Sequence, residues 1–168
     1  YGSVEGNIAD YVARQRESEG REGDIIRFAD GHMVKIKNDW YVRIHKCMDR
    51  IRFDRNIVDL IINEELDDLI PMLPENEIKR IREFEENFWH RVNVQEIAFS
   101  FLLEKAQEMS DRKTVALELV PTLDNKQDAS LLFKMLDGTT PREVVLSHIK
   151  QHIGTNVRWD KCAEWLKS

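Results

Sequence analysis

The sequence predicts a mainly α fold, in which a short N-terminal helix and one β-hairpin precede an all-helical C-terminal domain. Strand-forming residues cluster only between residues 23 and 37, around an Asp-Gly pair that favours a tight turn. After Asn38, apolar residues recur at the three- and four-residue spacing of helices, and Gly or Pro interrupts them at intervals typical of helix lengths. We therefore expect two regions, residues 1–38 and residues 39–168.

Composition limits the classes of protein to consider. Of the 168 residues, 42% are hydrophobic, so the chain can bury a core and is not expected to be disordered. A net charge of −6 excludes a uniformly basic, non-specific nucleic-acid binder. Cys47 and Cys162 lie far apart, which argues against a disulfide scaffold or a zinc module and favours a reducing compartment. We therefore expect a cytoplasmic protein. No membrane span is expected, because no apolar run approaches about 18 residues.

The N-terminal region is expected to contain three short elements. A helix is predicted from Asn7, its N-cap, to Glu17. Strands are predicted over residues 23–28 and 33–37, with Asp30 and Gly31 as a two-residue turn between them. An isolated two-stranded hairpin is marginally stable in water, so we expect it to pack on helices or to join a larger sheet.

The remaining segments all predict helices, separated by proline and glycine. The clearest local signal is Thr140-Pro141-Arg142-Glu143, with a Thr N-cap, Pro at the first helical position and Glu three residues after the cap. A long helix is expected after Pro74, either continuous or briefly broken before Met109. The other helices are predicted over residues 40–48, from Asp54 onward, and over 111–120, 129–136, 141–153 and about 159–166.

The predicted hairpin places charged side chains together. Pairing outward from the turn puts Ile26 opposite Lys35 and Asp24 opposite Lys37, so Glu22, Asp24 and both lysines are expected on one face. Two lysines there can hold phosphate oxygens, while a carboxylate holds Mg²⁺. An ordinary solvated hairpin face is the alternative. The opposite face is the expected core face, with Ile25, Val34 and Ile36.

The hairpin residues also carry a family resemblance. Glu22-Gly23-Asp24-Ile25-Ile26, Asp30-Gly31 and Lys35-Ile36-Lys37-Asn38-Asp39-Trp40-Tyr41-Val42 closely resemble the end of the catalytic domain of T-even phage RNA ligases. These are tRNA-repair enzymes of the covalent nucleotidyltransferase superfamily, in which motif IV is a Glu-Gly opening a strand and motif V is a Lys-x-Lys on the next. Residues 65–69 and 111–114 also look like that family's C-terminal domain, and the similarity covers nearly the whole chain.

The resemblance implies an activity and roles for three residues. In the family, a lysine attacks the α-phosphate of ATP to form lysyl-AMP, and AMP then passes to the 5′-phosphate of an RNA. The 3′-hydroxyl of the other RNA end attacks and releases AMP. Glu22 matches the motif IV glutamate at the metal and nucleotide site, and Lys35 and Lys37 match the motif V lysines that contact phosphates. The implied cofactors are ATP and Mg²⁺, and the implied partner is RNA, including tRNA.

One departure from the family concerns the nucleophile. The sequence contains no Lys-x-Asp-Gly motif, because Lys37-Asn38-Asp39 is followed by Trp40. We therefore expect the C-terminal portion of a ligase, without the N-terminal part of the nucleotidyltransferase domain, and no activity from the chain alone. The alternatives are a non-catalytic helical RNA-binding module and a protein-interaction module. Basic residues that can form an RNA footprint or an ordinary surface are Lys126, Lys134, Arg142, Lys150, Arg158, Lys161 and Lys167.

Three histidines and the four tryptophans are not expected to belong to a metal-binding or RNA-binding site. His90, His148 and His152 have no cysteine or carboxylate partner at a metal-ligand spacing, so no metal site is expected there. The tryptophans fall on apolar helix stripes, which favours core packing over base stacking. They are Trp40, Trp89, Trp159 and Trp165.

Overall fold

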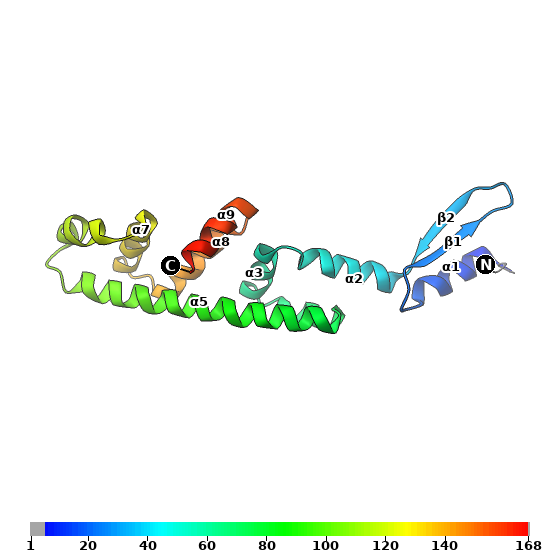
Figure 1. Cartoon of the computed structure of the whole chain (residues 1–168), viewed down its shortest axis with the longest axis horizontal. Coiled ribbons are helices and arrows are strands. Elements are labelled where there is room, and N and C mark those ends of the chain that lie inside the picture. The colour runs from blue at the N-terminus through cyan, green and yellow to red at the C-terminus, as the bar shows by residue number, and fades with distance from the viewer. Residues whose placement is uncertain (1–5, 168) are drawn as a thin grey trace.

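The computed structural model describes residues 6–167, and its fold is mainly α, as predicted. Figure 1 shows an elongated molecule, with α1 and the hairpin at one end and α2 leading from them to helices that gather along α5. The helices are α1 (Ile8–Glu17), α2 (Asp39–Arg50), α3 (Asp54–Ile62), α4 (Leu66–Leu69), α5 (Glu75–Gln107), α6 (Arg112–Thr114), α7 (Lys126–Leu136), α8 (Pro141–His152) and α9 (Asn156–Trp165), with short 3₁₀ or π segments η1 (Ile70–Met72), η2 (Val115–Leu119) and η3 (Val120–Thr122).

The hairpin turn differs from the predicted one. Strands β1 (Gly23–Arg27) and β2 (Met33–Lys37) are antiparallel, but the Phe28 amide donates to the His32 carbonyl at 2.8 Å. The loop is therefore three residues long, Ala29–Gly31, and Gly31 supplies the left-handed conformation (φ +88°) that follows the turn. The prediction of a two-residue turn is therefore wrong. The strand register also differs from the predicted one by one residue, and places Ile25 opposite Lys35 and Asp24 opposite Ile36.

A one-residue shift changes which side chains share a face of the hairpin. Ile36 is buried, with 6% of its surface exposed, whereas Ile25 is 66% exposed and shares the outer face with the lysines. The prediction that Ile25 faces the core is wrong. So is the prediction that Asp24 joins the lysines, because Asp24 Oδ2 accepts a hydrogen bond of 2.8 Å from Tyr11 Oη of α1.

The helix caps follow the sequence closely. Asn7 Oδ1 accepts from the Ala9 amide at 2.8 Å at the start of α1. Both hydrogen bonds of the capping box between Thr140 and Glu143 are present at the start of α8, which confirms that prediction. Asp54 is the first residue of α3 rather than its cap. Helix α5 is continuous over 33 residues, about 50 Å at 1.5 Å per residue.

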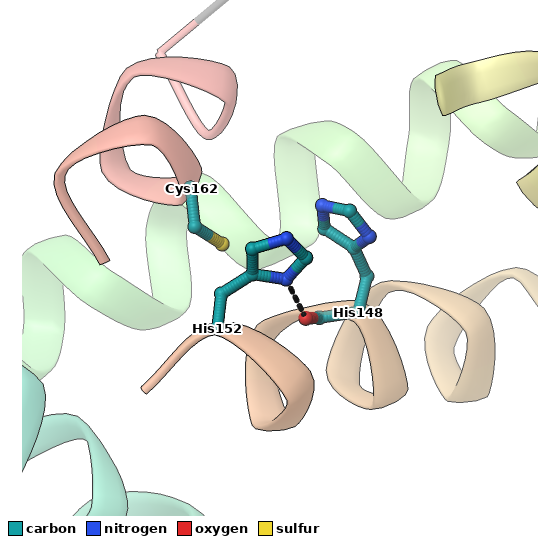
Figure 2. A group of neighbouring side chains, drawn as sticks. All are labelled: His148, His152 and Cys162. Atoms are coloured by element: carbon teal, nitrogen blue, oxygen red, sulfur yellow. Dashed lines mark hydrogen bonds between the residues drawn. The ribbon is translucent and has the colours of Figure 1, made fainter. Parts of the chain in front are cut away.

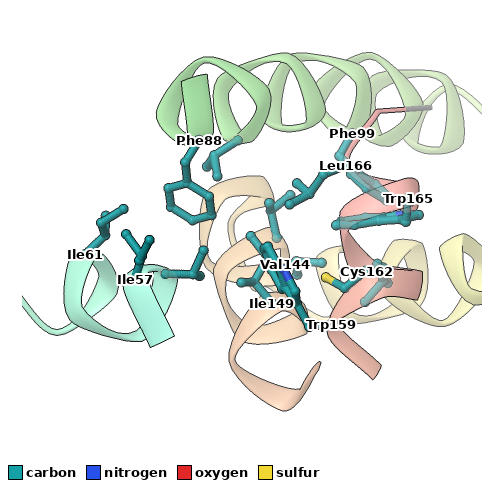
Figure 3. Close-up of a cluster of buried hydrophobic side chains, with 14 of the residues drawn as sticks. Ile57, Ile61, Phe88, Phe99, Val144, Ile149, Trp159, Cys162, Trp165 and Leu166 are labelled. Carbon is teal, nitrogen blue, oxygen red and sulfur yellow. The ribbon is translucent and has the colours of Figure 1, made fainter. Parts of the chain in front are cut away.

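The hydrophobic core lies in the helical region, where α7 and α8 both pack against α5. Figure 3 shows side chains from α3, α5, α8 and α9 meeting there. Trp159 and Trp165 are buried as predicted, while Trp40 and Trp89 are half-buried. Within the described residues, no helix has the length and apolar character needed to cross a bilayer. Labelled members of the core in Figure 3 are Ile57, Ile61, Phe88, Phe99, Val144, Ile149, Trp159, Cys162, Trp165 and Leu166.

Candidate functional site

Glu22 and Lys35 form the centre of the candidate site. Lys35 Nζ lies 2.5 Å from Glu22 Oε1, and the two side chains are 49% and 44% exposed. Strand alternation alone would place residue 22 on the opposite face from Lys35. Gly23 follows Glu22 in the sequence and begins strand β1 with φ +141°, a conformation that L side chains rarely adopt. This departure from regular strand geometry accounts for the contact between Glu22 and Lys35. The expected juxtaposition therefore exists, but the Glu-Gly backbone produces it rather than the expected register.

Lys37, two residues after Lys35 on β2, lies beside an aromatic pair on α2. Lys37 Nζ is 5.8 Å from the centre of the Tyr41 ring, and that ring is 4.1 Å from the ring of His45. Lys37 is exposed and, within residues 6–167, forms no ion pair. Its ammonium group is thus available to an added anion, whereas that of Lys35 is shared with Glu22.

The contact between Glu22 and Lys35 shifts the pKa of each group in the direction that favours its charged form. The hydrogen bond from Lys35 is the largest cause that lowers the pKa of Glu22, and the positive charges of Lys35, Lys37 and His45 lower it further. The same hydrogen bond raises the pKa of Lys35. Both shifts favour the charged forms of Glu22 and Lys35, so this pair is ionised near neutral pH.

A buried asparagine connects the elements that carry these residues. Asn38 is fully buried, and its Nδ2 donates to Ser18 Oγ at 2.8 Å and to the Ser18 carbonyl at 3.1 Å. Its backbone amide donates to the Glu22 carbonyl at 3.0 Å, and its own carbonyl accepts from Val42 in α2. Asn38 thus holds the end of α1, the Glu22 backbone and the start of α2 together.

This arrangement suits phosphate binding with a metal bridged to the phosphates. Lysine acts on phosphate as a compact positive charge. Mg²⁺ is commonly bound by one or two carboxylates, with phosphate oxygens and water completing its shell, and Glu22 can supply one such carboxylate. Asp24 does not contribute, since it is bonded to Tyr11 and forms an ion pair of 3.2 Å with Arg21.

A second group of potential metal ligands lies far from the hairpin in sequence. His148 and His152 of α8 face Cys162 of α9, with one ligand atom from each lying within 4.8 Å of the others (Figure 2). The sequence spacing, from which no metal site was expected here, does not reveal that Cys162 lies beside these two histidines. Their four-residue spacing is a readable signal of two side chains on one helix face, but the packing of α9 on α8 brings Cys162 to them.

The basic residues of the C-terminal helices lie on the surface. All seven that were considered as an RNA footprint are exposed. Arg142 pairs with Glu96 at 2.8 Å and Lys167 with Glu164 at 2.7 Å, so part of this positive charge is offset by carboxylates. An RNA footprint on these helices stays a prediction.

Comparison with known proteins adds no family assignment. No family model matches the sequence, and no solved structure matches the chain. The inferences that follow rest on the motif resemblance and on the geometry of the described residues.

Proposed function

We propose that this chain is the C-terminal portion of an ATP-dependent RNA ligase that joins RNA 5′-phosphate and 3′-hydroxyl ends in RNA or tRNA repair. The reaction passes through enzyme-AMP and RNA-adenylate intermediates and takes place in the cytoplasm, or in the host cytoplasm if the chain is viral. The observation that carries the proposal is the contact between Glu22 and Lys35, with Lys37 two residues along the same strand face. The residues that resemble motifs IV and V therefore include a pair in direct contact, which supports the proposal.

In this proposal the three residues act on the nucleotide phosphates. The ammonium groups of Lys35 and Lys37 bind phosphate oxygens of ATP and offset the negative charge that develops when the α-phosphate is attacked. Glu22 would hold Mg²⁺, whose positive charge would neutralise further phosphate charge. Because Glu22 pairs with Lys35, the metal-binding and phosphate-binding groups of the proposed site lie side by side.

The outer face of the hairpin gives further support. Ile25 is 66% exposed and Met33 56% exposed on the same face as the lysines. Two strands that leave apolar side chains uncovered are marginally stable alone. The proposal accounts for this face, because the rest of a nucleotidyltransferase domain would cover it and would supply the lysine that becomes adenylated.

The main test is adenylation by the complete ligase carrying Lys35→Ala or Lys37→Ala. We expect each variant to lose about 100-fold or more in the rate of enzyme-AMP formation, which is typical for removing one charge-stabilising donor. Lys150→Ala is a matched control, since Lys150 is an exposed lysine on α8 and this step needs no RNA. Wild-type adenylation by both hairpin variants would refute the proposed site.

Two further observations test the assignment as a portion of a ligase. The 168-residue chain alone is expected to form no covalent AMP adduct with ATP and Mg²⁺, and transfer of labelled AMP onto it would overturn this. The parent reading frame is expected to encode a Lys-x-Asp-Gly roughly 100 to 150 residues before Glu22, a distance typical of one domain.

A helical RNA-binding module is the second candidate, favoured by the exposed basic residues of α7, α8 and α9. It predicts that the chain binds RNA without ATP, that Lys35→Ala and Lys37→Ala leave this binding unchanged, and that affinity falls steeply with salt. Complete absence of RNA binding would instead favour a protein-interaction module.

A further inference from the structure

Helices α8 and α9 bring two imidazoles and a thiol into one cluster. His148 and His152 are four residues apart on α8, and Cys162 lies on the facing side of α9 (Figure 2). One nitrogen from each histidine and the Cys162 Sγ all lie within 4.8 Å of one another. Cys162 is fully buried and His148 is 7% exposed, whereas His152 is half-buried and gives the cluster access to solvent.

The hydrogen bond of His152 uses one ring nitrogen, Nδ1, and leaves the other, Nε2, as a potential metal ligand. His152 Nδ1 lies 2.7 Å from the backbone carbonyl of His148. A carbonyl oxygen accepts hydrogen bonds and cannot donate them, so Nδ1 carries a proton, and in the neutral tautomer with this hydrogen bond Nε2 has the lone pair. A metal-binding histidine commonly donates its other ring N–H to a backbone carbonyl, which fixes the tautomer and the direction of the ring.

His148 presents an unsatisfied nitrogen to the same cluster. Its Nε2 is buried and has no hydrogen-bond partner among the described residues. Buried polar side-chain atoms nearly always have a partner, so this atom requires an explanation. The centre of the His148 ring lies 4.3 Å from that of the His152 ring, so the two imidazoles already meet in the cluster.

We propose that His148, His152 and Cys162 bind one Zn²⁺ ion, with a fourth position open to water. Two imidazole nitrogens and one thiolate form a donor set that suits zinc, whereas Mg²⁺ and Ca²⁺ prefer oxygen. Ligand atoms around a tetrahedral zinc ion lie about 3.5 Å apart, so side-chain rotations that close the cluster by roughly 1 Å are sufficient.

Binding involves no oxidation or reduction. One Zn–S and two Zn–N bonds form as water ligands of the aqueous ion leave, the S–H bond of Cys162 breaks, and its proton passes to solvent. The ion would fasten α9 to α8 at the C-terminal end of the chain. This site lies on different elements from the hairpin, so its existence does not depend on the ligase assignment.

The test measures zinc retained by the full 168-residue chain. After chelation and reloading with Zn²⁺, we expect one equivalent per chain to remain through gel filtration, as measured by elemental analysis. His152→Ala and Cys162→Ser are expected to lose that equivalent, with affinity falling by more than the roughly 10- to 100-fold typical of outer-shell changes. His90→Ala, at an exposed histidine of α5, and Cys47→Ser, at the other free cysteine, are controls that should keep it.

A second measurement on the unaltered chain remains decisive if a variant fails to fold. Co²⁺ bound in place of zinc should give a thiolate-to-cobalt charge-transfer band in the near ultraviolet. Zn²⁺ should also protect Cys162 from alkylation, as read by mass spectrometry. Absence of a retained zinc equivalent, absence of the charge-transfer band, or equal retention by the folded ligand variants and the controls would overturn the proposal.

Discussion

The hairpin end and the helical region of this molecule are held together by different kinds of contact. Among the described residues of the two strands, only Ile36 is buried, and the surrounding contacts are polar: Tyr11 with Asp24, and Asn38 with Ser18. The helical region instead buries a continuous hydrophobic cluster from α2 to α9. The candidate phosphate-binding residues lie on the polar end, where their charges stay exposed.

This difference has an energetic consequence. A typical hydrogen bond contributes about 0.5–1.5 kcal/mol net and an exposed ion pair about 0–1 kcal/mol, whereas deleting much of a buried aliphatic side chain costs about 2–5 kcal/mol. We therefore expect the hairpin to open locally at a lower free energy than the helical region unfolds. Amide hydrogen exchange measures the two opening free energies, and equal values would show that the regions form one cooperative unit.

The largest expected effect comes from truncating a core side chain. Leu132 of α7 is fully buried, so Leu132→Ala should lower the free energy of unfolding by about 2–5 kcal/mol. Leu117→Ala makes the same chemical change at a leucine that is 66% exposed, and should change stability by no more than about 0.5 kcal/mol. Urea unfolding followed by circular dichroism compares the two, and similar losses would contradict the position of the core.

An intermediate effect is expected at the glycine between Glu22 and the strand. A Cβ on residue 23 would lie 1.9 Å from the Ile36 carbonyl oxygen, so Gly23→Ala should cost the hairpin at least about 1–3 kcal/mol and separate Glu22 from Lys35. Faster amide exchange in β1 and β2, with unchanged exchange in the helical core, is the expected result.

Gly31→Ala provides the matched control for this change. Gly31 also has a positive φ, but nothing lies within 4 Å of the added Cβ, so only backbone strain of about 1–2 kcal/mol is expected. If the Gly31 variant loosens the hairpin as much as the Gly23 variant, close approach to Ile36 is not the reason for glycine at residue 23.

The smallest expected effect is the pH dependence of the Glu22–Lys35 pair. The pKa of Glu22 is lowered by the fold, so the stabilisation by the pair is present above the ordinary glutamate pKa of about 4.3 and lost as pH falls through the lowered value. The pKa of Lys35 is raised, so the stabilisation persists below about 10.4 and is lost as pH rises through the raised value. Titration of the Glu22 carboxyl followed by NMR measures the lowered pKa of this group. The Lys35→Met variant should return the pKa of Glu22 towards its ordinary value. An unchanged pKa in that variant would contradict the contact.

Local sequence signals predicted the elements whose geometry depends on neighbouring residues. The capping box at Thr140 and the cap at Asn7 satisfy backbone groups within one turn, so their residue types suffice to identify them. The length of the hairpin loop was harder to predict, because Asp30-Gly31 fits a two-residue loop as well as the observed three-residue loop. Ile36, and not Ile25, is the buried isoleucine, and strand β2 lies against α1. This agrees with the observed register, which the turn residues alone do not determine.

The sequence by itself determined the mainly α fold, the helix caps at Asn7 and Thr140 and the presence of a charged hairpin, because periodicity and capping act over a few residues. Tertiary structure alone decided two contacts. Glu22 reaches Lys35 through the backbone conformation of Gly23, and Cys162 reaches His148 and His152 through the packing of α9 on α8. Both contacts join residues that are ten or more positions apart, and no local pattern specifies which of many such pairs the folded chain brings together.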